Sequence, residues 1–481
     1  MIGLFHQHLE MPYWSTLYLA GEWVIRIIML VYVPQHRTAA AARTWLLLIF
    51  LLPLPGMVIY AVFGRIRMPH ARTAQQMLAS QRIVQAQLQQ KAHLVCEPVL
   101  PPYLTHIPGL VARFGDFGVF AGNEVGLLPD YASFDTRLVA DIDAAKHHVH
   151  LLTYIIADDA TGERVSAALI RAAGRGVQCR LMADAVGSRS GLSRLADQLR
   201  RGGVEVTAML PVGFFRHNAA RFDLRNHRKL AVIDSNIGYI GSKNITNPGF
   251  VPGYPNEELM VRVTGPVVSQ IQAVLLADRF IETGDKVDFD ALFPCFPPPV
   301  GQRRNSCPAA QDQQENSQEL CIALLYAARQ RVVITTPYFV PDEPFLSALR
   351  SAARRGVEVR LIVSLHANQT FTQLAQRSYY ADLLASGVHV HLYRPRFLHA
   401  KHLSVDDCIA VVGSANIDIR SFALNAEVSF VIYDQTVVSR LRAVQEDSLA
   451  DSDVLDAAAW RQRPLQQRVS QNLARLADSL L

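Results

Sequence analysis

The 481-residue sequence contains only six cysteines, and no two of them form a Cys-x-x-Cys pair. This spacing argues against a zinc cluster or a disulfide framework, so we expect all six thiols to be reduced. Basic residues are only in small excess over acidic ones, with a net charge of +5. Such an excess suits an anionic partner, such as a phospholipid headgroup, without selecting it over nucleic acid.

Charge is absent altogether from residues 45–63. A helix of this length covers roughly 28 Å, which is close to the hydrocarbon thickness of a bilayer. An earlier apolar stretch, residues 11–33, carries Glu22 and Arg26, whose spacing of four predicts an ion pair turned toward the neighbouring helix. Together the two stretches predict a transmembrane two-helix hairpin in residues 1–68.

The arginines around the hairpin indicate its orientation. Arg65, Arg67 and Arg72 follow the second stretch, against two arginines in the loop before it. The positive-inside rule therefore favours a hairpin with both ends, and the main domain, in the cytoplasm. Residues 69–124, which include a Gln- and Ala-rich segment, are expected to form a connecting helix and linker.

The rest of the chain is an internal repeat of alternating strands and helices. Residues 171–177 read RAAGRGV and residues 351–357 read SAARRGV, and each follows a strand-like and a helix-like segment. A duplicated unit explains this agreement. We expect a first repeat in residues 125–296, a mobile linker rich in Pro, Gln, Asn and Ser in residues 297–319, and a second repeat with a C-terminal helix in residues 320–481. The apolar stripe of that helix is expected to pack on the domain.

Each repeat contains the same constellation of polar residues at the same internal spacing. The members are His, Lys, Asp, Ser and Asn, followed by an Asn-x-Glu segment. The first copy has His227, Lys229, Asp234, Ser242, Asn244 and Glu258, and the second has His399, Lys401, Asp406, Ser414, Asn416 and Glu427. A single His-x-Lys is usually a solvated strand end, but two matched copies predict one active site built from two halves.

Strand geometry and donor chemistry assign a role to each pair. Residues two apart on a strand share a face, so each His and its Lys project together, whereas each Asp projects to the other side. We therefore interpret the aspartates as supports for the strand. The Ser and Asn side chains can donate to phosphate oxygens, and the two glutamates can hold the second ring nitrogen of the histidines.

These groups predict a phosphoryl-transfer reaction without a metal or cofactor. One His attacks a phosphodiester phosphorus, and the other donates a proton to the departing alkoxide. Two Lys and two Asn spread the negative charge on the nonbridging oxygens. The histidines should hold opposite protonation states and titrate as a coupled pair.

At these motifs the chain resembles the phospholipase D superfamily and, more closely, its bacterial cardiolipin synthases. The run Asn226-His-Arg-Lys-Leu-Ala-Val-Ile-Asp234, the segments at residues 336–342 and 416–422, and the apolar residues 45–65 carry the resemblance. It implies an α/β fold of two fused repeats, each a mixed sheet flanked by helices, related by pseudo-twofold symmetry. It also implies that His227 is the nucleophile and His399 the acid–base. One departure is Asn256-Glu-Glu258, where the synthases often have Trp-Arg-Asp.

The resemblance implies that two phosphatidylglycerol molecules give cardiolipin and glycerol on a membrane bilayer, and that the chain is a multi-pass protein of the bacterial inner membrane. Phospholipase D hydrolysis, with water as the acceptor, and phosphatidylethanolamine as the phosphatidyl donor remain alternatives. A nuclease of the superfamily is disfavoured because it gains nothing from a membrane hairpin, so we expect no nucleic-acid partner. Intact His and Lys in both motifs argue against a non-catalytic scaffold. The oligomeric state stays open.

Overall fold

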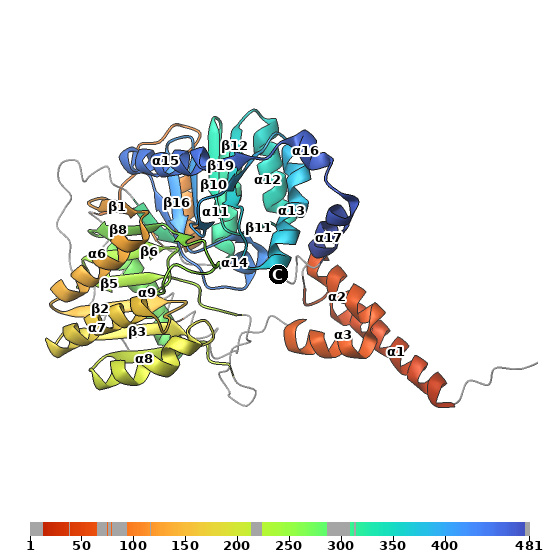
Figure 1. Ribbon diagram of the computed structural model, residues 1–481, viewed down its shortest axis with the longest axis horizontal. Helices are drawn as coiled ribbons and strands as arrows, with labels where there is room; N and C mark the ends of the chain where they lie inside the picture. The colour runs from red at the N-terminus through yellow and green to blue at the C-terminus, as the bar shows by residue number, and fades with distance from the viewer. Residues whose placement is uncertain are drawn as a thin grey trace, which may run out of the picture. The chain divides into compact units, whose positions relative to one another are not determined.

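The computed structural model describes residues 13–37, 39–64, 75, 78, 94–115, 117–212, 224–285, 308–311 and 314–476. They belong to two compact units, one of residues 1–68 with 476–481 and the other of residues 69–475 (Figure 1). The predicted connecting helix at residues 73–95 and an aromatic and basic segment at residues 214–221 fall largely outside the described residues.

The first unit, residues 1–68 with 476–481, contains the candidate membrane helix. Among the residues that the structure describes, one helix is long and apolar enough to cross a bilayer. This helix, α1, spans Tyr13–Tyr32. The predicted second span is divided into α2 (Ala39–Leu51), α3 (Pro53–Ile59) and a short π-helix, η1 (Tyr60–Gly64). Leu52 leaves helical geometry, with φ −134° and ψ 81°, because a residue before proline is disfavoured in the α region. The second stretch is therefore broken at its first proline, and the two-helix hairpin stays a prediction.

Close contacts hold α1, α2 and α3 of the first unit together. A Cβ atom at Gly56 would lie 2.9 Å from the Cα of Ile49, so α3 approaches α2 at a point where only glycine fits. The Glu22–Arg26 ion pair forms at 3.2 Å, and Arg26 Nε donates to the carbonyl of Phe50 at 3.3 Å. The pair therefore faces α2, as predicted.

The second unit is built on two sheets with the same central strand order. The first sheet has the order β1-β8-β6-β5-β2-β3-β4, and the second β19-β13-β12-β10-β15-β16-β18-β9. The first comprises β1 (Glu124–Leu128), β2 (His148–Thr153), β3 (Gln178–Asp184), β4 (Glu205–Met209), β5 (Leu230–Ile233), β6 (Ile237–Gly241) and β8 (Met260–Thr264). The second comprises β9 (Pro308–Gln311), β10 (Arg331–Thr335), β12 (Glu358–Ser364), β13 (His389–Tyr393), β15 (His402–Val405), β16 (Ile409–Gly413), β18 (Ser429–Ile432) and β19 (Ser452–Val454).

Six strands in succession correspond between the sheets, which confirms the internal repeat. In both, three parallel strands (β2, β3, β4 and β10, β12, β13) continue into three antiparallel ones (β5, β6, β8 and β15, β16, β18). Each sheet is therefore mixed, and each His-x-Lys segment leads directly into the first antiparallel strand, at β5 or at β15.

Helices cover the sheets and share a core between them. The first repeat has α6 (Tyr131–Ala144), α7 (Ala160–Gly174), α8 (Arg189–Arg201) and α9 (Val268–Thr283); the second has α11 (Gln314–Ala327), α12 (Glu343–Arg354), α13 (Thr370–Ala385), α14 (Ile419–Ala423) and α15 (Gln435–Ala450). Helix α5 (Ile107–Gly115) precedes them. Helices α6 to α8 pack on one face of the first sheet. Residues of α9, α15 and both sheets form a single apolar cluster, so the two repeats fold as one body.

Three expectations outside the motifs need correction. The predicted mobile linker contains β9, which pairs with β18, and the start of α11. Cys96 is disulfide-bonded, contrary to the expectation of six reduced thiols, whereas Cys179, Cys321 and Cys408 are free and buried. The C-terminal helix α17 (Leu465–Arg475) buries Gln471 and Ala474 and exposes its apolar stripe, the reverse of the packing that we predicted.

Candidate functional site

The two His-x-Lys segments are held by backbone pairing between the repeats. Asn226 and Ala426 form an isolated parallel β-bridge, and His227 N donates to the Ala426 carbonyl at 2.9 Å. In the same way β14 (Phe397–Leu398) pairs with β7 (Asn256–Glu257), and His399 N donates to the Glu257 carbonyl at 2.7 Å. Each histidine is therefore positioned by the chain segment that carries the other repeat's glutamate.

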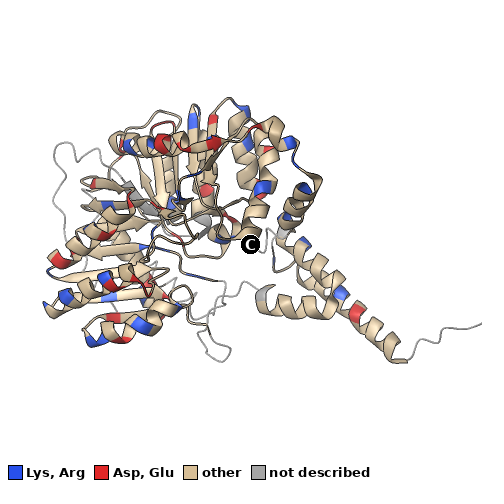
Figure 2. Cartoon of the chain, in the orientation of Figure 1, with Lys and Arg blue, Asp and Glu red and all other residues tan. Residues whose placement is uncertain are grey.

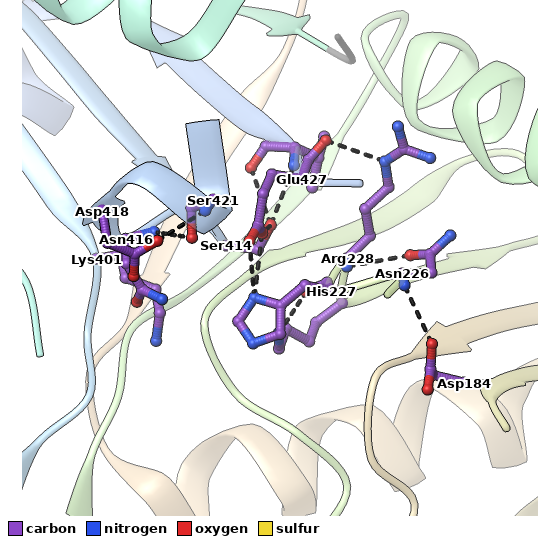
Figure 3. Close-up of polar contacts among 12 residues, drawn as sticks. Asp184, Asn226, His227, Arg228, Lys401, Ser414, Asn416, Asp418, Ser421 and Glu427 are labelled. Carbon is purple, nitrogen blue, oxygen red and sulfur yellow. Dashed lines mark hydrogen bonds and ion pairs between the residues drawn. The ribbon is translucent and has the colours of Figure 1, made fainter. Parts of the chain in front are cut away.

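The side chains repeat this exchange. His227 Nδ1 lies 3.0 Å from Glu427 Oε1 (Figure 3). In the same way, His399 Nδ1 lies 2.7 Å from Glu258 Oε1. A carboxylate accepts hydrogen bonds, so each ring carries its proton on Nδ1 and leaves Nε2 for substrate. Each histidine thus depends on a glutamate from the other half of the chain, and neither repeat holds a complete site.

The motif serines have a different partner from the phosphate that we expected. Ser242 Oγ donates to Glu258 Oε2 at 2.6 Å, and Ser414 Oγ donates to Glu427 Oε2 at 2.5 Å. Both hydroxyls are fully buried and also accept a backbone N–H, from Leu259 and Val428. The hydroxyl protons are committed to the glutamates, so the serines orient the groups that orient the histidines.

The motif asparagines are buried near the same place but differ in their contacts. Asn244 Oδ1 accepts the N–H of Ile155 at 3.2 Å. Asn416 Oδ1 has no hydrogen-bond partner among the described residues, and the backbone N–H of Asn416 donates to Ser421 Oγ (Figure 3). That both amides bind substrate phosphate stays a prediction.

The two lysines are buried and carry shifted pKa values. Lys229 Nζ donates to the carbonyl of His227, and Lys401 Nζ donates to that of His399 at 2.5 Å. Burial lowers the pKa of Lys229 to about 7 and that of Lys401 to about 8, while Glu258 and Glu427 act in the opposite direction. Lys401 further lowers the pKa of Lys229, so the lysines of the two repeats share one electrostatic environment.

The pKa of each histidine is lowered from its usual value, which favours neutral rings near pH 7 and not the opposite protonation states that we expected. Burial lowers the pKa of His399 to about 4, against the opposing effect of Glu258. Burial likewise lowers the pKa of His227, and Lys401 from the other repeat adds to the effect. The two glutamates stay ionised: although burial acts to raise the pKa of each, the facing histidine holds it below its usual value.

The motif aspartates lie in the turns at the far ends of β5 and β15, away from the histidines. Asp234 accepts the backbone N–H groups of residues 146, 147 and 148 at 2.8 to 2.9 Å, and Asp406 accepts those of residues 329, 330 and 331 at 2.7 to 2.8 Å. Both have positive φ, 51° and 48°, in the turn. They tie the turn to the start of β2 or β10, which agrees with the predicted role as supports.

We therefore expect Asp234→Asn to affect stability more than catalysis. An amide keeps one acceptor oxygen and loses the charge, so unfolding should become easier by about 1–3 kcal/mol. Thermal unfolding and kcat of the purified variant test this. A fall in kcat of more than about tenfold in protein that is still folded would contradict the supporting role.

Several side chains at the site were not recognised from sequence. The ring of Tyr154 lies edge-on to His227, with centroids 4.8 Å apart, and Phe250 lies 5.1 Å from His399 in the same way. Arg228 Nε donates to the Glu427 carbonyl at 3.0 Å, and its Nη1 pairs with Asp278 at 2.5 Å. The second motif has Ala400 at the position of Arg228, so the repeat itself gave no signal for this arginine.

Asp418 adds a further buried carboxylate beside Lys401. It caps α14 by accepting the N–H of Ser421 at 2.7 Å (Figure 3). Burial raises the pKa of Asp418, and the carboxylate in turn acts to raise that of Lys401. The first half has Thr246 at the corresponding position, and there the buried Asp184 acts to raise the pKa of Lys229 instead.

Comparisons with known proteins agree with this arrangement. A family model described as "Cardiolipin synthase, PLD-like domain" matches residues 138–278 and 321–447, one stretch in each repeat. The chain is 33% identical to cardiolipin synthase A of Serratia proteamaculans over 97% of this chain and 98% of that protein. The same identity and coverage relate it to cardiolipin synthase A of Klebsiella pneumoniae subsp. pneumoniae. Among solved structures, phosphatidylserine synthase of Haemophilus influenzae has the same fold, with a TM-score of 0.61 at 14% identity, covering 78% of this chain and 100% of that one.

Proposed function

Because the chain belongs to the cardiolipin synthase family, we propose that it transfers the phosphatidyl group of one phosphatidylglycerol to a hydroxyl of another, releasing glycerol. The family is one of phosphatidyltransferases. The observation that carries the proposal is the pair of crossed contacts, His227 with Glu427 and His399 with Glu258. They bring two oriented imidazoles and two buried lysines from separate repeats into one electrostatic site.

The charges at the site explain how an anionic substrate sets the protonation state. Below the lowered pKa of Lys229, both lysines are charged, both glutamates are ionised and both histidines are neutral, so these six groups sum to zero. A phosphodiester adds one negative charge, which raises the pKa of an imidazole beside it. Substrate binding therefore favours the one protonated histidine that the mechanism needs.

The transfer then proceeds in two in-line steps. Neutral His227 attacks phosphorus through Nε2, the bond from phosphorus to the glycerol oxygen breaks, and protonated His399 gives its proton to that oxygen. The hydroxyl of the second lipid next gives its proton to His399 and attacks phosphorus as the P–N bond breaks. His227 suits the attacking role because its side chain is 13% exposed, against 5% for His399. The lysines stabilise charge on the nonbridging oxygens.

Product analysis tests the reaction. Purified full-length protein supplied with phosphatidylglycerol in detergent should form cardiolipin and free glycerol in equal amounts, and EDTA should leave the rate largely unchanged. Phosphatidic acid as the sole product would show hydrolysis and overturn the proposed transfer. A requirement for added phosphatidylethanolamine would correct the donor while leaving the chemistry intact.

Lys229 gives the reaction an expected pH dependence. An amine holds a phosphate oxygen best when protonated, so kcat/KM should fall as the pH rises through the lowered pKa values of about 7 for Lys229 and about 8 for Lys401. In Lys229→Arg the side chain stays charged, so the alkaline limb should move upward even if the rate falls. Lys146→Arg, at an exposed position, is the matched control and should leave the profile unchanged. An unaltered limb in Lys229→Arg would contradict this assignment.

The proposal extends to symmetry and topology. The matching strand orders and crossed contacts support a pseudo-twofold relation between the repeats. Helix α1, followed by the broken pair α2 and α3, supports a membrane hairpin with the catalytic unit in the cytoplasm. The disulfide at Cys96 argues against the cytoplasmic orientation, since disulfides persist in oxidising compartments. Labelling of Lys146→Cys in intact cells by a membrane-impermeant maleimide would place the catalytic unit outside and overturn the cytoplasmic orientation.

A further inference from the structure

The C-terminal helix α17 is fixed to the catalytic unit by its polar side. It packs along α13, burying Gln471 and Ala474. Arg475 at its end pairs with Asp382 at 3.1 Å, and Arg463 before its start donates to Gln471 at 2.9 Å. The helix is therefore a docked element whose orientation is determined by contacts within the unit.

The outward side of α17 is apolar and uncovered. Leu465, Val469 and Leu473 recur every four residues and are 71%, 47% and 60% exposed. Val469 and the buried Gln471 are two residues apart, about 200° around a helix, so the exposed stripe and the docked side lie on opposite faces. Packing within the unit leaves this stripe uncovered, whereas most Leu and Val side chains of a folded protein lie in its core. An exposed apolar stripe of this kind indicates a surface that contacts a partner.

The charges around the stripe indicate what covers it. Residues 457–475 contain four arginines, Arg461, Arg463, Arg468 and Arg475, and no Asp or Glu. Figure 2 shows basic residues and no acidic ones on α17. An apolar stripe bordered by arginines is the pattern of a helix that lies in the headgroup region of an anionic bilayer.

The position of α17 in the chain supports the same partner. The next residue, Leu476, already belongs to the unit that contains the apolar helices, where its carbonyl accepts a hydrogen bond from Thr44 Oγ1 of α2 at 3.4 Å. Leu476 is itself 59% exposed and continues the stripe with a step of three residues. In the sequence, α17 is thus followed directly by residues of the unit that contains the candidate membrane span.

We propose that α17 is an interfacial helix, whose Leu465, Val469 and Leu473 insert among the headgroups of an anionic bilayer and hold the catalytic unit against the membrane surface. Anchoring at the C-terminal side of the second repeat complements the N-terminal span. The contact limits how the unit can turn above the lipid. The inference does not rest on the proposed transfer chemistry, because contact with lipid can be measured without turnover.

Depth-dependent quenching tests the contact directly. Val469→Cys and, as the matched control, Gln467→Cys on the other side of the same helix are labelled with an environment-sensitive fluorophore in the full-length protein. In vesicles of phosphatidylglycerol and phosphatidylcholine, lipids brominated on the upper acyl chain should quench the label at 469 at least about twofold more than the label at 467. The parent protein measures background labelling of Cys179, Cys321 and Cys408, which are buried.

Two results would overturn the proposal. Equal quenching at 469 and 467 would show that the stripe does not meet lipid. The label at 469 could instead be shielded from water only at high protein concentration and show no quenching by the brominated lipid. That result would assign the stripe to contact with a second copy of the chain. As an independent measure, Leu465→Glu/Leu473→Glu should raise the KM for lipid in vesicles about fivefold or more with little change in kcat, whereas Gln467→Glu should not. An unchanged KM in the double variant would also count against the interfacial helix.

Discussion

Replacing either motif histidine, as His227→Ala or His399→Ala, should lower kcat for cardiolipin formation by at least about 10³-fold. Each ring has a role that alanine cannot take over: one forms the bond to phosphorus, and the other moves the proton. His399 is buried and His227 is largely covered, each against a glutamate. The assay is cardiolipin formation from phosphatidylglycerol by the purified full-length variant, compared with the parent at equal concentrations of folded protein.

The matched control is His389→Ala, which removes an exposed histidine at the start of β13, outside either motif. Its rate should stay within about twofold of the parent, as expected for a surface substitution. The double variant His227→Ala/His399→Ala should be no slower than the slower single variant, because residues that act as a unit are not additive. More than about a tenth of the parental rate in either single variant would refute a two-histidine mechanism.

Sequence alone was sufficient where a local period or an internal match determines the structure. The repeat predicted from residues 171–177 and 351–357 appears as two sheets with six corresponding strands, since each strand is specified by its own apolar pattern. The aspartate supports were predicted for the same reason. The prediction used the alternation of side chains along an extended segment from His227 to Asp234, although β5 itself begins at Leu230 and Asp234 lies in the turn that follows it.

Sequence failed where the partner is set by long-range packing. Glu258 and Glu427 were recognised as holders of imidazoles, but the exchange between repeats depends on β7 pairing with β14 across the interface, which no local pattern encodes. The serines were assigned to phosphate because the position of the glutamates relative to Ser242 and Ser414 cannot be read from spacing. An apolar stripe in a helix likewise shows amphipathicity without showing which side docks, and α17 docks by its polar side.

The crossed pairing leads to the second large expected effect, in Glu427→Gln and Glu258→Gln. A glutamine can still accept the Nδ1–H hydrogen bond but removes the negative charge that stabilises an imidazolium or a phosphohistidine. Each variant should lose about 10²–10⁴-fold in kcat on phosphatidylglycerol. Glu257→Gln is the matched control, because the side chain of Glu257 pairs with Arg396 at 2.8 Å instead of a histidine, and its rate should stay within about tenfold of the parent.

A substrate with a better leaving group separates the two glutamates. Phosphatidyl-p-nitrophenol releases a stabilised phenolate, which needs no proton from the acid histidine. If Glu258 serves His399, release of p-nitrophenol by Glu258→Gln should recover toward the parental rate in a single turnover. Glu427→Gln should remain slow, because its defect lies in the attacking His227. The reverse pattern, with Glu427→Gln rescued and Glu258→Gln slow, would mean either that each glutamate serves the histidine of its own repeat or that His399 is the nucleophile. The same assay on His227→Ala and His399→Ala distinguishes these two cases, since only the variant that keeps the nucleophile can release the phenolate.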